Sequence, residues 1–160
     1  MNTLYVRDLL GLYVPAATET ILAEAKRRIA QRLRRGTPLT SPAQVREVLQ
    51  IKFSDYEREV FACLFLDNRH RLIQFLELFF GTIDAASIHP REVVKAALKV
   101  NAAAVIFCHN HPSGFAEPSA ADKTVTERLK AALGTVDIRV LDHFIVGGEE
   151  LYAFTEHGLL

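Results

Sequence analysis

The most informative segment of this 160-residue chain is residues 109–122, which read HNHPSGFAEPSAAD. His109 and His111 stand where a short apolar run ends, and side chains two residues apart in extended backbone point to the same side. Asp122 falls about one turn into the helix that the following residues predict. Ligands bind beyond the carboxyl ends of the strands in open α/β sheets, so two imidazoles and one carboxylate are expected to meet there.

This combination of side chains is typical of a catalytic zinc site. Structural zinc is usually closed by four protein ligands, whereas catalytic zinc keeps a position free for water. Zinc lowers the pKa of that water to about 7, and a nearby carboxylate must then take and return the proton. Two plainer interpretations stay open from spacing alone: Ser119 and Asp122 also form a helix N-cap, and the two histidines could be polar loop residues.

Apolar patterning on both sides of this segment predicts a layered α/β domain. Continuous apolar runs at residues 60–66 and 103–108 are typical of strands buried on both faces. Residues 72–80 return as a strand that Gly81 and Asp84 break. The same reasoning predicts helices at residues 18–35, from Pro42 after a Ser41 cap, from Pro90 and from 119 to about 133, and strands at 138–141, 143–146 and 151–154. Helices that alternate with strands around one sheet form a layered domain.

The spacing H-x-H-x7-S-x-x-D resembles the metal-binding motif of the JAMM (JAB1/MPN+) metalloproteases, and it is filled here without a gap by His109, His111, Ser119 and Asp122. The surrounding residues, from about Tyr56 to Phe154, resemble the bacterial RadC family more closely. The strings that carry this resemblance are LFLDNRHRLI, GTID, HPREVVKAAL, NAAAVI, HNHPSG, EPSAAD and IRVLDHFIVG. A match with several separate motifs in order is specific for the family.

The resemblance implies a fold and a metal site. The fold is a JAMM/MPN-type domain, a mixed β-sheet flanked by helices, and the metal is one Zn²⁺ per chain held by His109, His111 and Asp122. In these hydrolases a serine at the position of Ser119 helps to stabilise the oxyanion, a role that its hydroxyl could combine with capping the helix.

The family's general base is a glutamate at the start of an earlier strand, ahead of a run of apolar residues. Glu59, immediately before residues 60–66, fits this position best, while Glu57 and Glu77 are alternatives. His143, in the string LDHFIVG, is expected to be hydrogen-bonded in place rather than to serve as a ligand, because three ligands are already supplied.

The chain is expected to divide into an N-terminal helical appendage, residues 1–50, and a RadC-like JAMM domain, residues 51–160. The helix-hairpin-helix-type segment that many RadC members carry is not recognisable in residues 1–49, so the chain resembles a short form. The first helix has a basic outer face that could touch phosphates. However, the 19 basic and 19 acidic residues of the chain leave no net charge to attract nucleic acid.

The leading hypothesis is a zinc-dependent hydrolase that cleaves a peptide or isopeptide-type amide, with Glu59 moving the protons. A DNA-associated protein linked to DNA repair and a catalytically silent interaction module are the alternatives. A zinc deaminase is excluded because the chain has neither H-x-E nor P-C-x-x-C, and the H-E-x-x-H helix of other zinc proteases is also absent.

Composition indicates the class of protein and the cellular location in which this chemistry is expected. An apolar share of 49% with 24% charged residues excludes a disordered or fibrous chain. Cys63 and Cys108 lie in apolar runs, where thiols behave as buried hydrophobes, so no disulfide framework is expected. Without a secretory signal or an apolar stretch of about 20 residues, the expected location is the cytoplasm, with no membrane contact. A protein or peptide substrate is the expected partner, and the sequence leaves direct nucleic-acid binding and the oligomeric state open.

Overall fold

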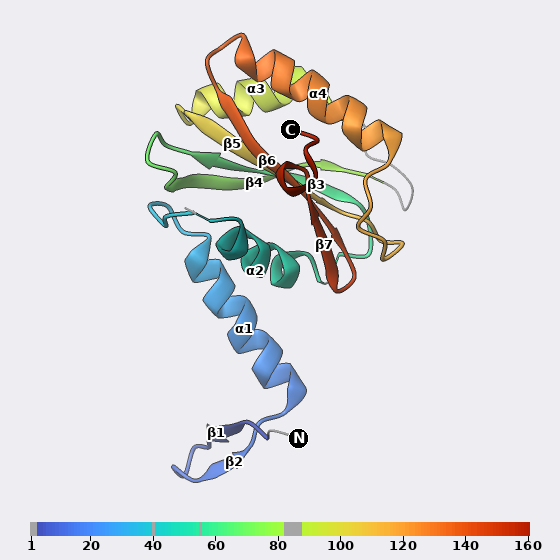
Figure 1. Ribbon diagram of the computed structural model, residues 1–160. Coiled ribbons are helices and arrows are strands. Elements are labelled where there is room, and N and C mark those ends of the chain that lie inside the picture. The colour runs from blue at the N-terminus through green and yellow to red at the C-terminus, as the bar shows by residue number, and fades with distance from the viewer. Residues whose placement is uncertain (1–2, 40, 55, 82–87) are drawn as a thin grey trace.

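The computed structural model describes residues 3–39, 41–54, 56–81 and 88–160, and within these ranges five strands form one mixed sheet (Figure 1). The strands lie in the order β4-β3-β5-β6-β7. Their bounds are β3 Val60–Leu66, β4 Leu72–Phe80, β5 Ala104–Asn110, β6 Arg139–Gly147 and β7 Glu150–Ala153. The pair β5–β6 is parallel and each other pair is antiparallel, which confirms the mixed sheet that the family resemblance implied.

Helices cover both faces of this sheet. α3 (Pro90–Lys99) and α4 (Ala120–Gly134) pack on one face, and α2 (Pro42–Phe53) packs on the other. Every residue of β3 and β5 is buried, as predicted for strands covered on both sides. Along β3, Phe61 and Cys63 pack with α3 and α4, whereas Ala62 and Leu64 pack with α2. None of the helices in the described ranges is both long and apolar enough to cross a membrane.

The two strands predicted at residues 138–141 and 143–146 are one continuous strand, β6. Asp142 interrupts the apolar pattern of the sequence, but its buried carboxylate accepts hydrogen bonds from neighbouring groups in the fold. Asp142 Oδ1 accepts the backbone N–H groups of His143 (2.8 Å) and Thr155 (3.1 Å), and Oδ2 accepts the Thr155 hydroxyl (2.6 Å). Because no polar atom of Asp142 is left unpaired, the strand continues through it. The break predicted at Gly81 and Asp84 lies largely outside the described residues.

The N-terminal residues extend away from the sheet along α1 (Thr18–Arg32), as Figure 1 shows. At the far end of α1, β1 (Tyr5–Arg7) and β2 (Tyr13–Pro15) form an antiparallel hairpin that the sequence analysis did not predict. The N-terminal region therefore contains this hairpin in addition to the two predicted helices, α1 and α2. The division of the chain at residue 50 stays a prediction, and α2 crosses that point while it packs on the sheet.

Candidate metal centre

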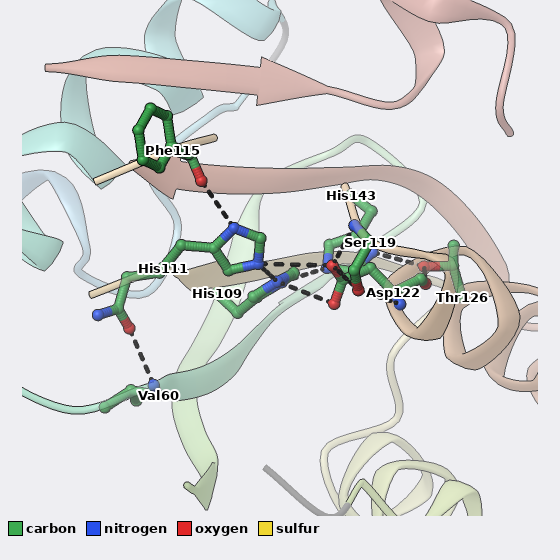
Figure 2. Close-up of polar contacts among 9 residues, drawn as sticks. Val60, His109, His111, Phe115, Ser119, Asp122, Thr126 and His143 are labelled. Atoms are coloured by element: carbon green, nitrogen blue, oxygen red, sulfur yellow. Dashed lines mark hydrogen bonds and ion pairs between the residues drawn. The ribbon is translucent and has the colours of Figure 1, made fainter. Parts of the chain in front are cut away.

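His109 lies at the end of β5 in the middle of the sheet, where its strand neighbours are Phe61 of β3 and Ile145 of β6. Its side chain is only 1% exposed. His111 follows β5, and its backbone N–H donates to the Val146 carbonyl (2.8 Å), which keeps the chain extended over both histidines. As the spacing predicts, the two imidazoles point to the same side, and their Nε2 atoms lie 3.0 Å apart (Figure 2).

Asp122 reaches the two histidines from the first turn of α4. Ser119 is the N-cap of this helix, and its hydroxyl oxygen accepts the Asp122 N–H (3.1 Å). In return, Asp122 Oδ2 accepts the Ser119 N–H (2.7 Å) and the Ser119 hydroxyl (2.6 Å). The same carboxylate lies 3.2 Å from His109 Nε2 through Oδ1 and 3.4 Å from His111 Nε2 through Oδ2. The helix cap therefore aims the carboxylate at the histidines, and the three candidate ligand atoms lie within 4.8 Å of one another.

The proton of the His111 imidazole can be assigned from its second nitrogen. Nδ1 lies 2.7 Å from the Phe115 carbonyl oxygen (Figure 2). A carbonyl oxygen only accepts hydrogen bonds, so Nδ1 carries the proton. His111 Nε2, which faces Asp122 and His109, is therefore the nitrogen that can release its proton and offer a lone pair to a metal ion.

His109 is held instead by a row of side chains, which we call the His109–His143–Thr126 relay. His109 Nδ1 lies 2.9 Å from His143 Nε2, and His143 Nδ1 lies 2.6 Å from Thr126 Oγ1. The Thr126 hydroxyl donates its single proton to the Asp122 carbonyl (2.6 Å), so it must accept from His143 Nδ1. Burial holds the pKa of His143 well below its usual value, so the ring is neutral and accepts at Nε2 from His109 Nδ1. His143 is thus hydrogen-bonded in place, as predicted, and it leaves Nε2 as the nitrogen of His109 that is available to a metal ion.

The chemistry of this donor set fits a divalent cation. The hydrogen bond to Asp122 raises the pKa of His111, although burial opposes this shift. Burial alone would raise the pKa of Asp122, but hydrogen bonds from His109 and His111 hold it well below its usual range. Positive charge is therefore favoured between these groups, and a metal ion competes with protons for the same atoms. Two imidazole nitrogens and one carboxylate oxygen are ligand types that zinc takes, and three ligands leave a position free.

Glu59 lies beside this group, directly before β3, and the backbone around it is fixed by the residue between the two histidines. Asn110 Oδ1 accepts the Val60 N–H (2.8 Å), and Asn110 Nδ2 donates to the Arg58 carbonyl (3.0 Å). Both neighbours of Glu59 are therefore tied to the end of β5. The half-buried Glu59 carboxylate also contributes, after the hydrogen bond to Asp122, to the raised pKa of His111.

The two alternative glutamates lie in less suitable places. Glu57 is exposed. The Glu77 carboxylate is bound by Lys52 Nζ (2.8 Å) and by the Tyr56 hydroxyl. Tyr56 packs with the α2 face of the sheet, whereas the histidines face α4. The geometry favours Glu59 among the three glutamates, and its role as general base stays a prediction.

Gly147, the last residue of β6, allows the loop after β5 to pack against that strand. A Cβ atom at this position would lie 2.4 Å from both the Ala116 nitrogen and the Phe115 carbonyl carbon. Any larger residue would therefore displace the backbone whose carbonyl binds His111 Nδ1. Glycine is required here by the close approach of two backbone segments.

Three residues that support this group were not predicted from the sequence: Asn110, Thr126 and Gly147. Thr126 had a local signal, because it lies four residues after Asp122 and so on the same face of α4. The other two had no such signal, since their contacts join segments that are far apart in the sequence.

Comparisons with known proteins agree with this fold. A family model described as "RadC-like JAB domain" matches residues 39–159. A UPF0758 protein of Aeromonas hydrophila is 56% identical over 151 residues, which cover 94% of this chain and 67% of that protein. A UPF0758 protein of Thioalkalivibrio sulfidiphilus has the same identity and coverage, and one of Halorhodospira halophila is 52% identical over 159 residues, 99% of this chain and 71% of that protein. The chain spans about two thirds of the length of these relatives, whose names state no activity.

Proposed function

The chain belongs to the RadC family of proteins with a JAB-type domain, and from this premise we propose that it is a zinc-dependent hydrolase acting on a peptide or isopeptide-type amide bond. The observation that supports this most strongly is the convergence of two Nε2 atoms, each oriented by the partner of its own Nδ1, with the Asp122 carboxylate. One ion per chain with a free position suits hydrolysis better than a structural role. A protein or peptide is the substrate that we expect.

Each residue of the centre has a role in this proposal. Zinc bound at His109, His111 and Asp122 would supply a Lewis acid and a water molecule with a pKa of about 7. Glu59 would take the proton of that water and return it to the leaving amine. The Ser119 hydroxyl, which donates to Asp122 at rest, would turn to stabilise the oxyanion.

Metal content is the first test of this proposal. We expect about one zinc per purified wild-type chain by elemental mass spectrometry, and none in the His109→Ala/His111→Ala double variant. His157→Ala is the matched control, because this exposed histidine lies outside the group and its loss should not change the zinc content. Zinc retained by the double variant would contradict the assignment of the ligands.

Turnover is the second test, and it separates the three glutamates. Glu59→Gln is expected to keep zinc but to lose at least about 100-fold in hydrolysis of a library of peptide and isopeptide substrates. Glu57→Gln and Glu77→Gln should retain activity. Full activity in Glu59→Gln would show that another group is the base.

The two alternative functions have weaker support. On the basic face of α1, Glu24 pairs with Arg27 and Arg28, and Glu47 pairs with Arg32, so acidic side chains offset part of the charge available to DNA. A catalytically silent module would not need the imidazoles of His109 and His111 to be oriented so that both Nε2 atoms face one point. Zinc binding without hydrolysis of any substrate in the library would favour that module.

A further inference from the structure

The large apolar side chains that the fold leaves exposed are concentrated near the N-terminus. Within the described residues, most of them lie between residues 4 and 22: Leu4, Tyr5, Leu9, Leu10, Leu12, Tyr13, Val14, Ile21 and Leu22. We call residues 4–22 the arm. The arm comprises the β1–β2 hairpin and the start of α1, and it lies at the end of α1 away from the sheet (Figure 1). Apolar surface gathered in this way on a folded chain marks an interaction site.

The tip of the arm is an ordered turn that presents two leucines to solvent. Asp8 Oδ1 accepts the N–H groups of Leu10 (2.9 Å) and Leu12 (2.8 Å), and Gly11 adopts the positive φ of 83° that the turn requires. Leu9 and Leu10 are 106% and 85% exposed. The hydrogen bonds of this turn are satisfied within the hairpin, so the two leucines are held outward rather than left in a loose loop.

A groove of about 540 Å³ lies between α1, α2 and β4. Its walls are mainly apolar, and they include Ile29, Ala30, Leu33, Ile51, Ile73 and Phe75. Lys26 and Lys52 also line the groove. One helix, α1, thus carries the arm at its start and forms a wall of the groove at its end.

We propose that the arm of a second copy of this chain fills this groove, in a two-fold dimer in which the two α1 helices run antiparallel. Antiparallel pairing places the start of α1 in one copy beside the end of α1 in the other, so each arm reaches the groove of its partner. The hairpin of the arm does not reach the groove of its own chain, because the first eight residues of α1, about 12 Å of helix, separate it from Lys26, the first residue of the groove, and carry it away from the sheet (Figure 1). Both halves of the contact come from one sequence, as a closed two-fold dimer requires.

The exposed apolar surface of the arm and its scarcity of basic residues both favour a second copy as the occupant. Seven of the nine large apolar residues of the arm are more than half exposed, and their burial on a partner contributes apolar area to the ~800 Å² per partner that a stable interface buries. Residues 3–22 contain a single basic residue, Arg7, so the arm suits a protein surface and not nucleic acid.

Molar mass in solution tests this dimer. Light scattering after size exclusion, at micromolar chain concentration, should give about twice the chain mass of 17.9 kDa. L9S combined with L10S is expected to raise the dissociation constant at least about tenfold, because both tip side chains leave the apolar contact. A30R, which places a charge in the groove, should weaken the dimer from the other side of the same contact. L98S is the matched control, since Leu98 is a 51% exposed leucine on α3, and it should leave the dimer unchanged.

Two results would overturn the proposal. One is a wild-type chain that is a monomer at these concentrations, and the other is a dimer that persists in both L9S/L10S and A30R. Circular dichroism and zinc content, measured on the same samples, distinguish loss of the dimer from loss of the fold. The dimer and the hydrolase proposal are independent, because the arm and the groove contain none of the candidate metal ligands.

Discussion

The two histidines of the metal centre are separated by one residue in the sequence but are held in different ways. His109 is 1% exposed, and the side chains of His143 and Thr126 fix its imidazole. The His111 side chain is 18% exposed, and a backbone carbonyl, that of Phe115, fixes its imidazole. Both arrangements place a proton on Nδ1 and leave Nε2 as the nitrogen that can bind a metal ion. The centre therefore depends on two separate supports, a side-chain relay and a packed loop, and each can be removed without the other.

The largest effect is expected from Gly147→Ala, which removes the support of His111. The added Cβ would lie 2.4 Å from backbone atoms of Phe115 and Ala116, so the loop must move and the hydrogen bond to His111 Nδ1 is lost. We expect the free energy of unfolding to fall by about 3 kcal/mol and zinc affinity to fall by about 100-fold. Chemical denaturation and competitive zinc titration measure the two effects.

Gly134→Ala is the control for this substitution. Gly134 ends α4, and a Cβ atom there would meet nothing within 4 Å. This variant should be as stable as the wild type or up to about 1 kcal/mol more stable, because alanine favours a helix over glycine. If Gly147→Ala behaved in the same way, the loop would not depend on close packing against β6.

Removal of the other support, by His143→Ala, is expected to have the next largest effect. The buried Nδ1–H of His109 loses its acceptor, so the tautomer with its lone pair on Nε2 is no longer fixed. Zinc affinity should fall about 10-fold to 100-fold, as for other residues that orient a metal ligand. His143→Gln, whose amide can accept from His109 and donate to Thr126, should recover part of this loss.

Imidazole nitrogen chemical shifts distinguish this role from a general loss of stability. In the metal-free wild type we expect the ¹⁵N signals of His109 to show a protonated Nδ1 that donates to His143. His143→Ala should give a mixture of tautomers for His109 while His111 keeps its own, because a different group holds it. An unchanged His109 spectrum in His143→Ala would show that the relay does not set the tautomer.

The sequence could predict those elements of the fold that have a local signal, either a run of apolar residues or a helix cap. The apolar runs of β3 and β5 predict strands covered on both faces, and the Ser41 and Ser119 caps predict where α2 and α4 begin. The β1–β2 hairpin escaped prediction because its strands have three residues each and alternate little in burial. The sequence predicted two strands in place of β6 because Asp142 interrupts the apolar run. The partner that satisfies its buried carboxylate, Thr155, lies 13 residues away and cannot be recognised from the local pattern.

The same distinction applies to the metal centre. The spacing of His109, His111 and Asp122 is a local pattern, because a strand end and a helix start bring them together within 14 residues. The supports are long-range: His143 lies 34 residues from His109, and Asn110 binds the backbone of Val60 across 50 residues. Sequence can therefore indicate which atoms bind a metal, whereas strand pairing decides what orients them.

A smaller effect is expected at the far end of the relay, from Thr126→Val. Valine keeps the shape of threonine but cannot accept from His143 Nδ1, so one buried donor loses its partner at a cost of about 1–2 kcal/mol in the free energy of unfolding. Zinc affinity should fall by less than about 10-fold, because the rings of Phe61, Phe107 and Phe154 still pack around His143.

Thr124→Val is the matched control on the same helix. The Thr124 hydroxyl donates to the Ala120 carbonyl (2.9 Å) in the exposed part of α4, away from the relay. This change should alter the free energy of unfolding by no more than about 0.5 kcal/mol and leave zinc affinity unchanged. Equal effects of the two valine variants would mean that the Thr126 hydroxyl matters only to the helix.

The smallest effect is expected on the opposite face of the sheet, at Glu77, which supports neither histidine. Burial alone would raise the pKa of Glu77, but hydrogen bonds from Lys52 and Tyr56 lower it below its ordinary value near 4.5. A carboxylate with a lower pKa in the folded state stabilises the fold above its unfolded pKa, and this contribution is lost as the pH falls through the folded pKa. Glu77→Gln should therefore lower the free energy of unfolding by about 1 kcal/mol at neutral pH, and the difference from the wild type should shrink as the pH falls below about 4. If the difference in the free energy of unfolding did not depend on pH, the charge of Glu77 would not be what stabilises the fold. If Glu77→Gln lost zinc, the two faces of the sheet would be coupled.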